Sequence, residues 1–346
     1  MNPHTSLISA LSILLGTTLT ISSNHWITAW AGLEINTLAI IPLISKSHHP
    51  RAIEASIKYF LTQAAASTII LFSSTVNAWS TGQWDITQLT HPTACTLLTS
   101  AIAMKLGLVP FHFWFPEVLQ GSSLTTALLL STVMKFPPVA IFLMTSNSLN
   151  PTLLTTMAIS SVALGGWMGL NQTQVRKLLA FSSIAHLGWM TSITIFNPKL
   201  ALLTFYMYIL ITSAIFLGLS TTNSLSLSTA MASWTKTPPL NAALMVTLLS
   251  LAGLPPLSGF LPKWLIIQEL TKQEMTTTAT IIALLSLLSL FFYLRLTYYS
   301  TITMPPNSTN HMKQWRPNKL TPPTIAILMT LSSSLLPLSP MALAAA

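Results

Sequence analysis

Long apolar runs, separated by short polar breaks, follow one another along almost the whole chain. Each run holds about twenty residues, which is the length an α-helix needs to cross the hydrocarbon core of a bilayer. The runs number eleven, at about 3–22, 25–45, 55–79, 94–119, 124–145, 149–170, 176–196, 199–220, 238–271, 277–300 and 322–343. The pattern predicts an all-α polytopic membrane protein with eleven transmembrane helices.

The breaks between runs are mostly very short. Ser22-Ser23-Asn24 and Asn197-Pro198 are examples, and connections of this length make neighbouring helices antiparallel. A transmembrane β-barrel would instead show segments of about ten residues with alternating polarity. The uninterrupted runs therefore favour helices over a barrel.

Composition excludes a soluble protein. Of the 346 residues 51% are hydrophobic and only 6% are charged, whereas a soluble domain carries roughly 25% charged residues. The net charge of +9 does not predict a nucleic-acid partner, because the basic residues are scattered and form no clustered patch. Membrane lipids are expected neighbours. The single cysteine, Cys95, is expected to pack as a small hydrophobe.

Basic residues between the runs predict the orientation of the chain. With eleven spans, the loops at 46–54, 171–177, 221–237 and 301–321 share a side with the N-terminus, and they hold Lys46, Arg51, Arg176, Lys177, Lys236, Lys313, Arg316 and Lys319. The opposite loops hold little beyond Lys199 and Lys272. The positive-inside rule places the N-terminus inward, and the odd number of spans then places the C-terminus outward.

Two runs are interrupted by proline in the same way. Residues 107–116 and 253–262 share the pattern G-L-x-P-x5-P, and the two copies are 146 residues apart. Paired broken helices in two halves of a transporter indicate an internal repeat whose breaks line a site near the membrane midplane. Glycine and proline are also frequent in membrane helices, so a chance match remains the alternative.

Four charged residues lie deep inside apolar runs: Glu34, Lys105, Lys135 and Lys263. A charge at the centre of a membrane helix costs about 2.5–3.5 kcal/mol on insertion scales, and such residues mark ion or proton pathways. Glu34 is predicted to be a carboxylate that pairs with Lys105. The alternative is a protonated side chain that only bonds a neighbouring helix.

Lys135 and Lys263 are the remaining deep amines. Lys135 is about 15 Å from either end of its run at helical rise, which argues against its reaching the membrane surface by snorkelling. Lys263 directly follows the second broken element, where Glu117 is the equivalent residue in the first. Both lysines are predicted to carry protons.

His186 lies at the centre of run 176–196, and His112 lies beside the first break. Each is either a relay, because histidine titrates near neutral pH, or a hydrogen-bonded core residue. Other charges are predicted to be structural: Glu54 and Lys58 have i, i+4 spacing, and Arg295 is expected to snorkel.

No cofactor site is predicted. The chain has no Walker loop, no G-x-G-x-x-G sequence and no cysteine cluster, so the residues that hold nucleotides, flavin or iron–sulfur clusters are missing. No metal site or paired haem-ligating histidines are expected either.

Several segments together carry a specific resemblance. They are MNPHTSL, WAGLEINTLAIIP, KLGLVPFHFWFPEV, KLLAFSSIAHLGWM and GLPPLSGFLPKW. Through them, over essentially its whole length, the chain resembles the vertebrate, mitochondrially encoded chain 2 family of NADH–ubiquinone oxidoreductase (respiratory complex I), one of the antiporter-like families of the proton-pumping membrane arm.

The resemblance implies a fold of two inverted five-helix repeats, about 1–147 and 148–300, plus a terminal helix at about 322–343. It implies a glutamate–lysine pair at Glu34 and Lys105, a central lysine at Lys135, an exit-side lysine at Lys263, and His186 on the axis between them. Animal members look truncated, because they lack three N-terminal helices of bacterial relatives.

The resemblance also implies a place and a role. The chain would lie in the mitochondrial inner membrane with its N-terminus in the matrix and its C-terminus in the intermembrane space. It would move protons while NADH, FMN, iron–sulfur clusters and ubiquinone act in other subunits. Expected neighbours are subunits 4L and 4, accessory subunits and lipids, with cardiolipin among the candidates.

Two other classes of function fit the residues. A stand-alone cation/proton antiporter would share the broken, repeated helices, and would be active as a purified chain. In a purely structural membrane subunit the buried charges would only hold helices together.

Overall fold

The computed structural model describes residues 3–235, 237–302 and 323–338. Within these ranges the regular elements are helices, and the only β-type pairings are two isolated bridges. The predicted all-α class is therefore confirmed for the described chain. The predicted loop residues Lys236, Lys313, Arg316 and Lys319 lie outside it, as does the end of the expected terminal helix.

The helices follow the predicted runs closely. In chain order they are α1 (Pro3–Ser22), α2 (Trp26–Ile44), α3 (Pro50–Thr81), α4 (Pro92–Leu106), α5 (Trp114–Gly121), α6 (Leu124–Ser131), α7 (Phe136–Met144), α8 (Pro151–Gly169), α9 (Val175–Ile193), α10 (Pro198–Thr222), α11 (Leu227–Ala232), α12 (Pro238–Ala252), α13 (Phe260–Lys272), α14 (Thr276–Ile302) and α15 (Pro323–Ser334). Short 3-10 turns, such as η2 (Val133–Lys135), join some of them.

Seven helical stretches in the described residues are long and apolar enough to cross a membrane. They are α1, α2, α3, the combined α6–α7 stretch, α8, α10 and α14. The helices of the broken runs are individually too short, and α9 is not among the seven. The predicted count of eleven spans is thus not settled by the helices themselves.

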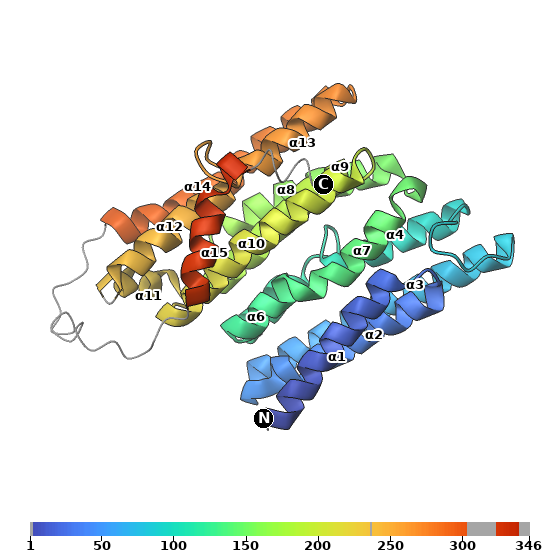
Figure 1. Ribbon diagram of the computed structural model, residues 1–346, viewed down its shortest axis with the longest axis horizontal. Helices are drawn as coiled ribbons and strands as arrows, with labels where there is room; N and C mark the ends of the chain where they lie inside the picture. The colour runs from blue at the N-terminus through green and yellow to red at the C-terminus, as the bar shows by residue number, and fades with distance from the viewer. Residues whose placement is uncertain (1–2, 236, 303–322, 339–346) are drawn as a thin grey trace.

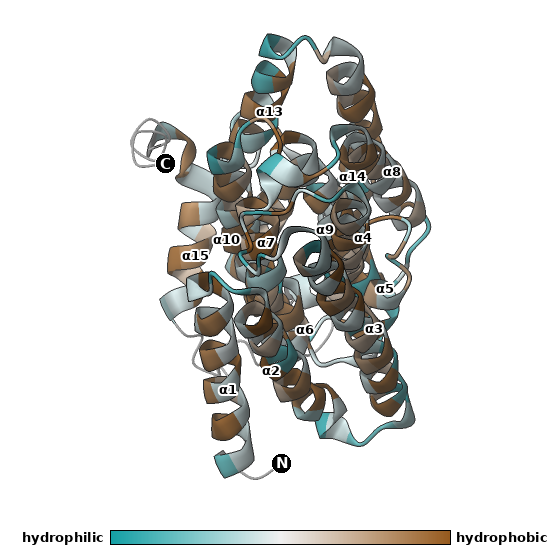
Figure 2. Cartoon of the chain, turned by 90° about the vertical axis from the view of Figure 1, so that its right-hand side faces the viewer, coloured by the Kyte–Doolittle hydropathy of each residue, from teal (hydrophilic) through white to brown (hydrophobic). Residues whose placement is uncertain are grey.

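The helices form one bundle with a common long direction (Figure 1). The α1–α3 group lies at one end of the row, α4–α7 lie beside it, and α8–α14 form the other end. Helix α15 crosses this second group and packs on α10 and α12. Hydrophobic residues cover the bodies of the helices, while hydrophilic residues gather at helix ends and connecting loops (Figure 2), as a bilayer requires.

The two proline-broken runs have the same local design. Corresponding landmarks, each pair 146 residues apart, are Pro92 and Pro238 at the helix starts, Gly107 and Gly253 at the ends, and Trp114 and Phe260 where the second helices begin. Both glycines have positive φ, 75° and 84°, a conformation that glycine adopts without strain. The pattern correctly predicted both breaks. The repeat boundaries near 147 and 148 stay a prediction.

Helices α8 and α9 pack so closely that glycine is needed between them. A Cβ on Gly188 would lie 2.2 Å from the Ser161 hydroxyl and 3.0 Å from the Ala158 carbonyl oxygen. Small residues of this kind let membrane helices approach until their backbones touch. This contact fixes α9, which carries His186, against α8.

We therefore expect Gly188→Ala to destabilise the assembled protein by about 1–3 kcal/mol, the usual cost of overpacking. Helix propensity alone would act in the opposite direction by about 1 kcal/mol. Thermal inactivation of the variant measures the effect, with the exposed Thr156→Ala on α8 as control. Equal stability of the two variants would contradict the tight contact.

The charged residues outside the deep runs, predicted to be structural, make the following contacts. Lys58 bonds Glu54 at 2.5 Å, and also Glu117 on α5 at 2.5 Å. Cys95 is free and buried. The guanidinium of Arg295 donates to the carbonyl oxygens of Leu170 at 2.5 Å and Gln172 at 2.7 Å, and so completes the end of α8. That it snorkels to the membrane surface stays a prediction.

Candidate functional site

Glu34 lies in the middle of α2 and faces α3. One carboxylate oxygen accepts a hydrogen bond from the Ser67 hydroxyl, and the other accepts one from Thr37 at 3.0 Å. Hydroxyl donors of this kind stabilise a buried carboxylate without neutralising its charge. The residue is only partly buried within the chain.

Lys105 lies in the last turn of α4, just before the Gly107 break. Its side chain is 6% exposed, and its Nζ makes no hydrogen bond within the described residues. Glu34 acts on it electrostatically. However, no ion pair of the described residues includes Lys105. The structure therefore places the predicted pair near each other but not in direct contact.

One face of α3 connects these two groups. Tyr59, Gln63 and Ser67 recur at i, i+4 and i+8, which puts them on the same side of the helix. All three are buried. Ser67 bonds Glu34, while the Gln63 amide donates to the Lys105 carbonyl oxygen at 3.5 Å. This row of polar side chains was not predicted from the sequence, although their spacing of four residues is visible there.

Lys135 ends the 3-10 turn that separates α6 from α7. Helix α7 begins at the following Phe136-Pro137-Pro138. Proline is tolerated in the first turn of a helix, because a backbone N–H there would have no partner within the helix. The amine is 3% exposed. It donates to the Tyr208 hydroxyl at 3.3 Å and lies 4.7 Å from the centre of the Phe115 ring. Polarised aromatic groups partly replace its hydration.

A small cavity joins Lys105 to Lys135. It has a volume of about 20 Å³, and Tyr59, Gln63 and Trp114 help to line it together with the two lysines. Roughly 10–15 Å³ is enough for one water molecule, provided polar partners are present. Its lining includes residues with polar side chains, Lys105, Lys135 and Gln63, of the kind that such a water needs.

A second small cavity joins His186 to Lys263. Its volume is about 30 Å³, and Tyr208 and Thr204 of α10 also line it. The His186 ring lies 5.7 Å from the Tyr208 ring, centre to centre. Tyr208 also bonds Lys135, which lines the first cavity. This tyrosine therefore lies between the two cavities.

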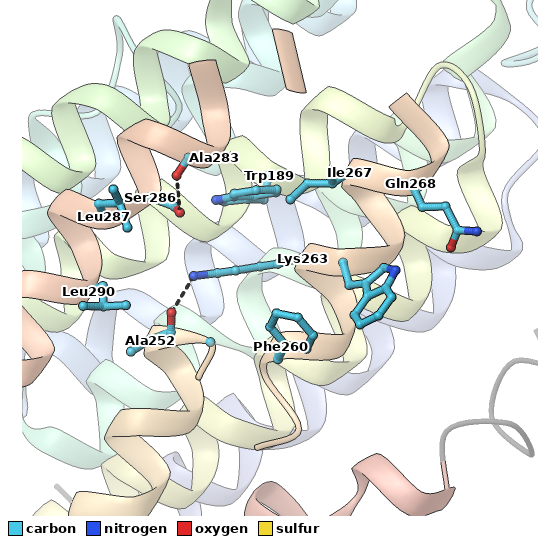
Figure 3. Close-up of a pocket in the computed structure, with 12 residues that line it drawn as sticks. Trp189, Ala252, Phe260, Lys263, Ile267, Gln268, Ala283, Ser286, Leu287 and Leu290 are labelled. Atoms are coloured by element: carbon cyan, nitrogen blue, oxygen red, sulfur yellow. Dashed lines mark hydrogen bonds between the residues drawn. The ribbon is translucent and has the colours of Figure 1, made fainter. Parts of the chain in front are cut away.

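Lys263 projects from α13 across the second break. Its Nζ donates to the Ala252 carbonyl oxygen at 2.7 Å, at the C-terminal end of α12, where the helix dipole favours a cation. A Cβ on Gly253 would lie 2.9 Å from the lysine side chain. The amine enters a pocket of about 410 Å³ between α9, α13 and α14, lined by apolar side chains such as Trp264 and Leu287 (Figure 3).

His112 does not join this arrangement. Its ring is buried, with 2% exposure, and packs on Phe113 at 4.2 Å between centres. The cavities between the lysines do not include His112. The structure thus brings together Lys105, Lys135, His186 and Lys263, with Glu34 at one end.

Comparisons with known proteins agree along the whole chain. A family model described as NADH:quinone oxidoreductase/Mrp antiporter, TM, matches residues 23–289, and one described as NADH dehydrogenase subunit 2 C-terminus matches residues 290–343. The NADH-ubiquinone oxidoreductase chain 2 of Struthio camelus is 78% identical over 345 residues, covering 100% of both chains. The chain belongs to the NADH-ubiquinone oxidoreductase chain 2 family.

Other chain 2 proteins give the same result, and that of Gallus gallus is 72% identical over 341 residues and 99% of each chain. Among solved structures, respiratory complex I from Thermus thermophilus matches with a TM-score of 0.85 and 27% identity, over 97% of this chain and 79% of that one. The Mrp complex from Dietzia has the same fold, with a TM-score of 0.75 at 20% identity, over 86% and 60%.

Membership of the chain 2 family makes the protein a membrane subunit of respiratory complex I, an oxidoreductase, and a protein of the mitochondrial membrane. Its membrane-spanning helices agree with that location. The predicted family and the predicted role in complex I are confirmed, so the alternative of an independent transporter is not needed.

Proposed function

We propose that this chain carries protons for complex I along the line Glu34, Lys105, Lys135, His186 and Lys263. The observation that carries the proposal is the pair of water-sized cavities: one spans Lys105 and Lys135, and the other spans His186 and Lys263. Protons pass between fixed groups through single waters, so short hydrated gaps between titratable side chains suit this task.

The balance of charge supports transfer along the line. Three amines share one carboxylate, and neither Lys135 nor Lys263 forms an ion pair within the described residues. A buried amine without an anion is costly when protonated, and neighbouring like charges add to the cost. At least one amine on the line therefore favours the neutral form and can accept a proton.

Movement of Glu34 is the natural switch in this scheme. The carboxylate is held by hydroxyls of Thr37 and Ser67 and is not bonded to Lys105. If it approached Lys105, it would hold a proton there. When it returned to the hydroxyls, Lys105 would release that proton toward the cavity shared with Lys135. His112 remains a weaker candidate for a side branch.

We also propose the topology of the chain and its neighbours in the complex. Eleven spans, as two inverted five-helix repeats and a terminal helix, would place the N-terminus in the matrix and the C-terminus in the intermembrane space. Subunits 4L and 4, accessory subunits and lipids, with cardiolipin among the candidates, would surround the chain. NADH, FMN, iron–sulfur clusters and ubiquinone would bind elsewhere in the complex, since the sequence lacks the motifs that hold them.

The test is to replace Lys105 or Lys263 by Met in assembled complex I and to reconstitute the complex into vesicles. We expect protons pumped per second to fall about tenfold. That is less than the 10²–10⁴-fold typical of a positioned acid–base group, because water in the adjacent cavity can partly substitute. The exposed Lys272→Met, which removes the same charge at a helix end, should leave pumping unchanged.

Unchanged pumping in both Lys105→Met and Lys263→Met would refute the relay. Poor assembly with normal pumping per assembled complex would instead favour a structural role for the buried charges.

A further inference from the structure

The proposed line has a gap that its five titratable groups do not fill. Lys135 lines the first cavity but not the second, whereas His186 and Lys263 line the second but not the first. A proton that reaches Lys135 therefore needs another group to continue. Resting on the proposed function, we propose that the Tyr208 hydroxyl carries the proton between Lys135 and the cavity shared by His186 and Lys263.

The position of Tyr208 fits this step. It lies on α10 near the middle of an apolar helix and is 6% exposed. Its hydroxyl accepts the Lys135 hydrogen bond at 3.3 Å, and its ring lies 5.0 Å from the same ammonium. Tyr208 also lines the second cavity and lies against the His186 ring. Ser183 on α9 provides a further polar contact to the phenol.

Within the described chain, Tyr208 is the side chain that both bonds Lys135 and borders the second cavity. A buried phenol requires a hydrogen-bond partner, and Ser183 already offers a neutral one. Tyr208 nevertheless also accepts a hydrogen bond from Lys135, the least exposed of the three relay lysines. A hydroxyl with more than one polar neighbour can accept a proton on one side and donate one on the other.

The chemistry of the step balances without forming a tyrosinate. The phenol oxygen takes a proton from the Lys135 ammonium, so that an N–H bond breaks and an O–H bond forms. The original phenol proton leaves toward the His186 imidazole or a water molecule in the second cavity. Rotation of the hydroxyl then restores the starting state. The phenol is both a donor and an acceptor, which this exchange requires.

The first experiment uses Tyr208→Phe in assembled, reconstituted complex I. The change removes only the hydroxyl and keeps the ring beside Lys135 and His186. We expect pumping per assembled complex to fall several-fold, and the deuterium solvent isotope effect on pumping to rise, because proton transfer becomes slower. Tyr206→Phe is the matched control. Tyr206 lies on the same helix and is 53% exposed, so both quantities should stay unchanged.

A second variant separates proton transfer from packing. Tyr208→His replaces the phenol by a different shape that can still accept and donate a proton. A relay predicts that Tyr208→His pumps faster than Tyr208→Phe, whereas a packing role predicts the reverse because phenylalanine is closer in shape to tyrosine. Pumping by the Phe variant equal to or above that of the His variant would overturn the assignment.

The outcomes also separate this inference from the proposed function. If Lys263→Met lowers pumping as expected while Tyr208→Phe pumps normally with an unchanged isotope effect, the line stands and Tyr208 is not part of it. If Lys105→Met and Lys263→Met both pump normally, the line itself fails.

Discussion

Replacing Lys135 by Met is expected to stop proton transfer and at the same time to stabilise the protein. Lys135 is the least exposed amine of the line, and among the described residues it bonds a neutral phenol and no carboxylate. Exchange of buried charged groups for hydrophobic residues of similar volume is often neutral or stabilising by 1–4 kcal/mol. Pumping should fall at least about a hundredfold, more than for Lys105→Met, because Lys135 is the lysine of the first cavity that bonds Tyr208, and water in that cavity does not replace this bond.

Two measurements on the same preparation check this result: pumping per assembled complex, and the temperature at which the complex loses activity. Lys199→Met, at the exposed start of α10, is the control and should change neither. A Lys135→Met complex that is less stable but pumps normally would mean that the lysine only holds α6, α7 and α10 together.

Gly259→Ala is expected to prevent assembly almost completely. A Cβ at this position would lie 1.7 Å from the Ser250 carbonyl oxygen and 2.7 Å from its carbonyl carbon. Both atoms belong to the backbone of α12, so no side-chain rotation can relieve the overlap. The cost should exceed about 3 kcal/mol, the upper part of the range for overpacked sites. Because Gly259 immediately precedes α13, the change would also displace Lys263.

The measurement is the yield of assembled complex I, followed by the pumping rate of whatever assembles. Pro256→Ala alters the same break at an exposed position and should assemble normally. Normal yield of Gly259→Ala would show that α12 and α13 are not held as closely as the structure describes them.

Much of the fold could be predicted from the sequence because each membrane-spanning helix corresponds to one continuous apolar segment of the chain. The starts and ends of α1, α8 and α14 agree with the prediction within a few residues. Both breaks were predicted from glycine and proline, whose backbone restrictions are local. The carbonyl partners of Arg295, on Leu170 and Gln172, could not be predicted because they are more than a hundred residues away in sequence.

The sequence identified which residues belong to the candidate site, but it did not show which of them are in contact. Charges in apolar runs identify Glu34 and the three lysines, because insertion costs select against them elsewhere. Their mutual distances depend on helix packing, so the missing direct contact between Glu34 and Lys105 could not be foreseen. Tyr206 and Tyr208 illustrate the same limit: two residues apart on a helix they face different sides, and only packing shows which one is buried.

The smallness of the two cavities has a consequence for ion selectivity. Volumes of about 20 and 30 Å³ hold roughly one water molecule each. A sodium or potassium ion crosses a membrane only if several oxygen atoms replace its hydration shell, and neither cavity has room for that many. A proton needs no such shell because it moves by exchange between neighbouring bonds. Passage along this line would therefore leave the membrane sealed to the alkali cations that outnumber protons around it.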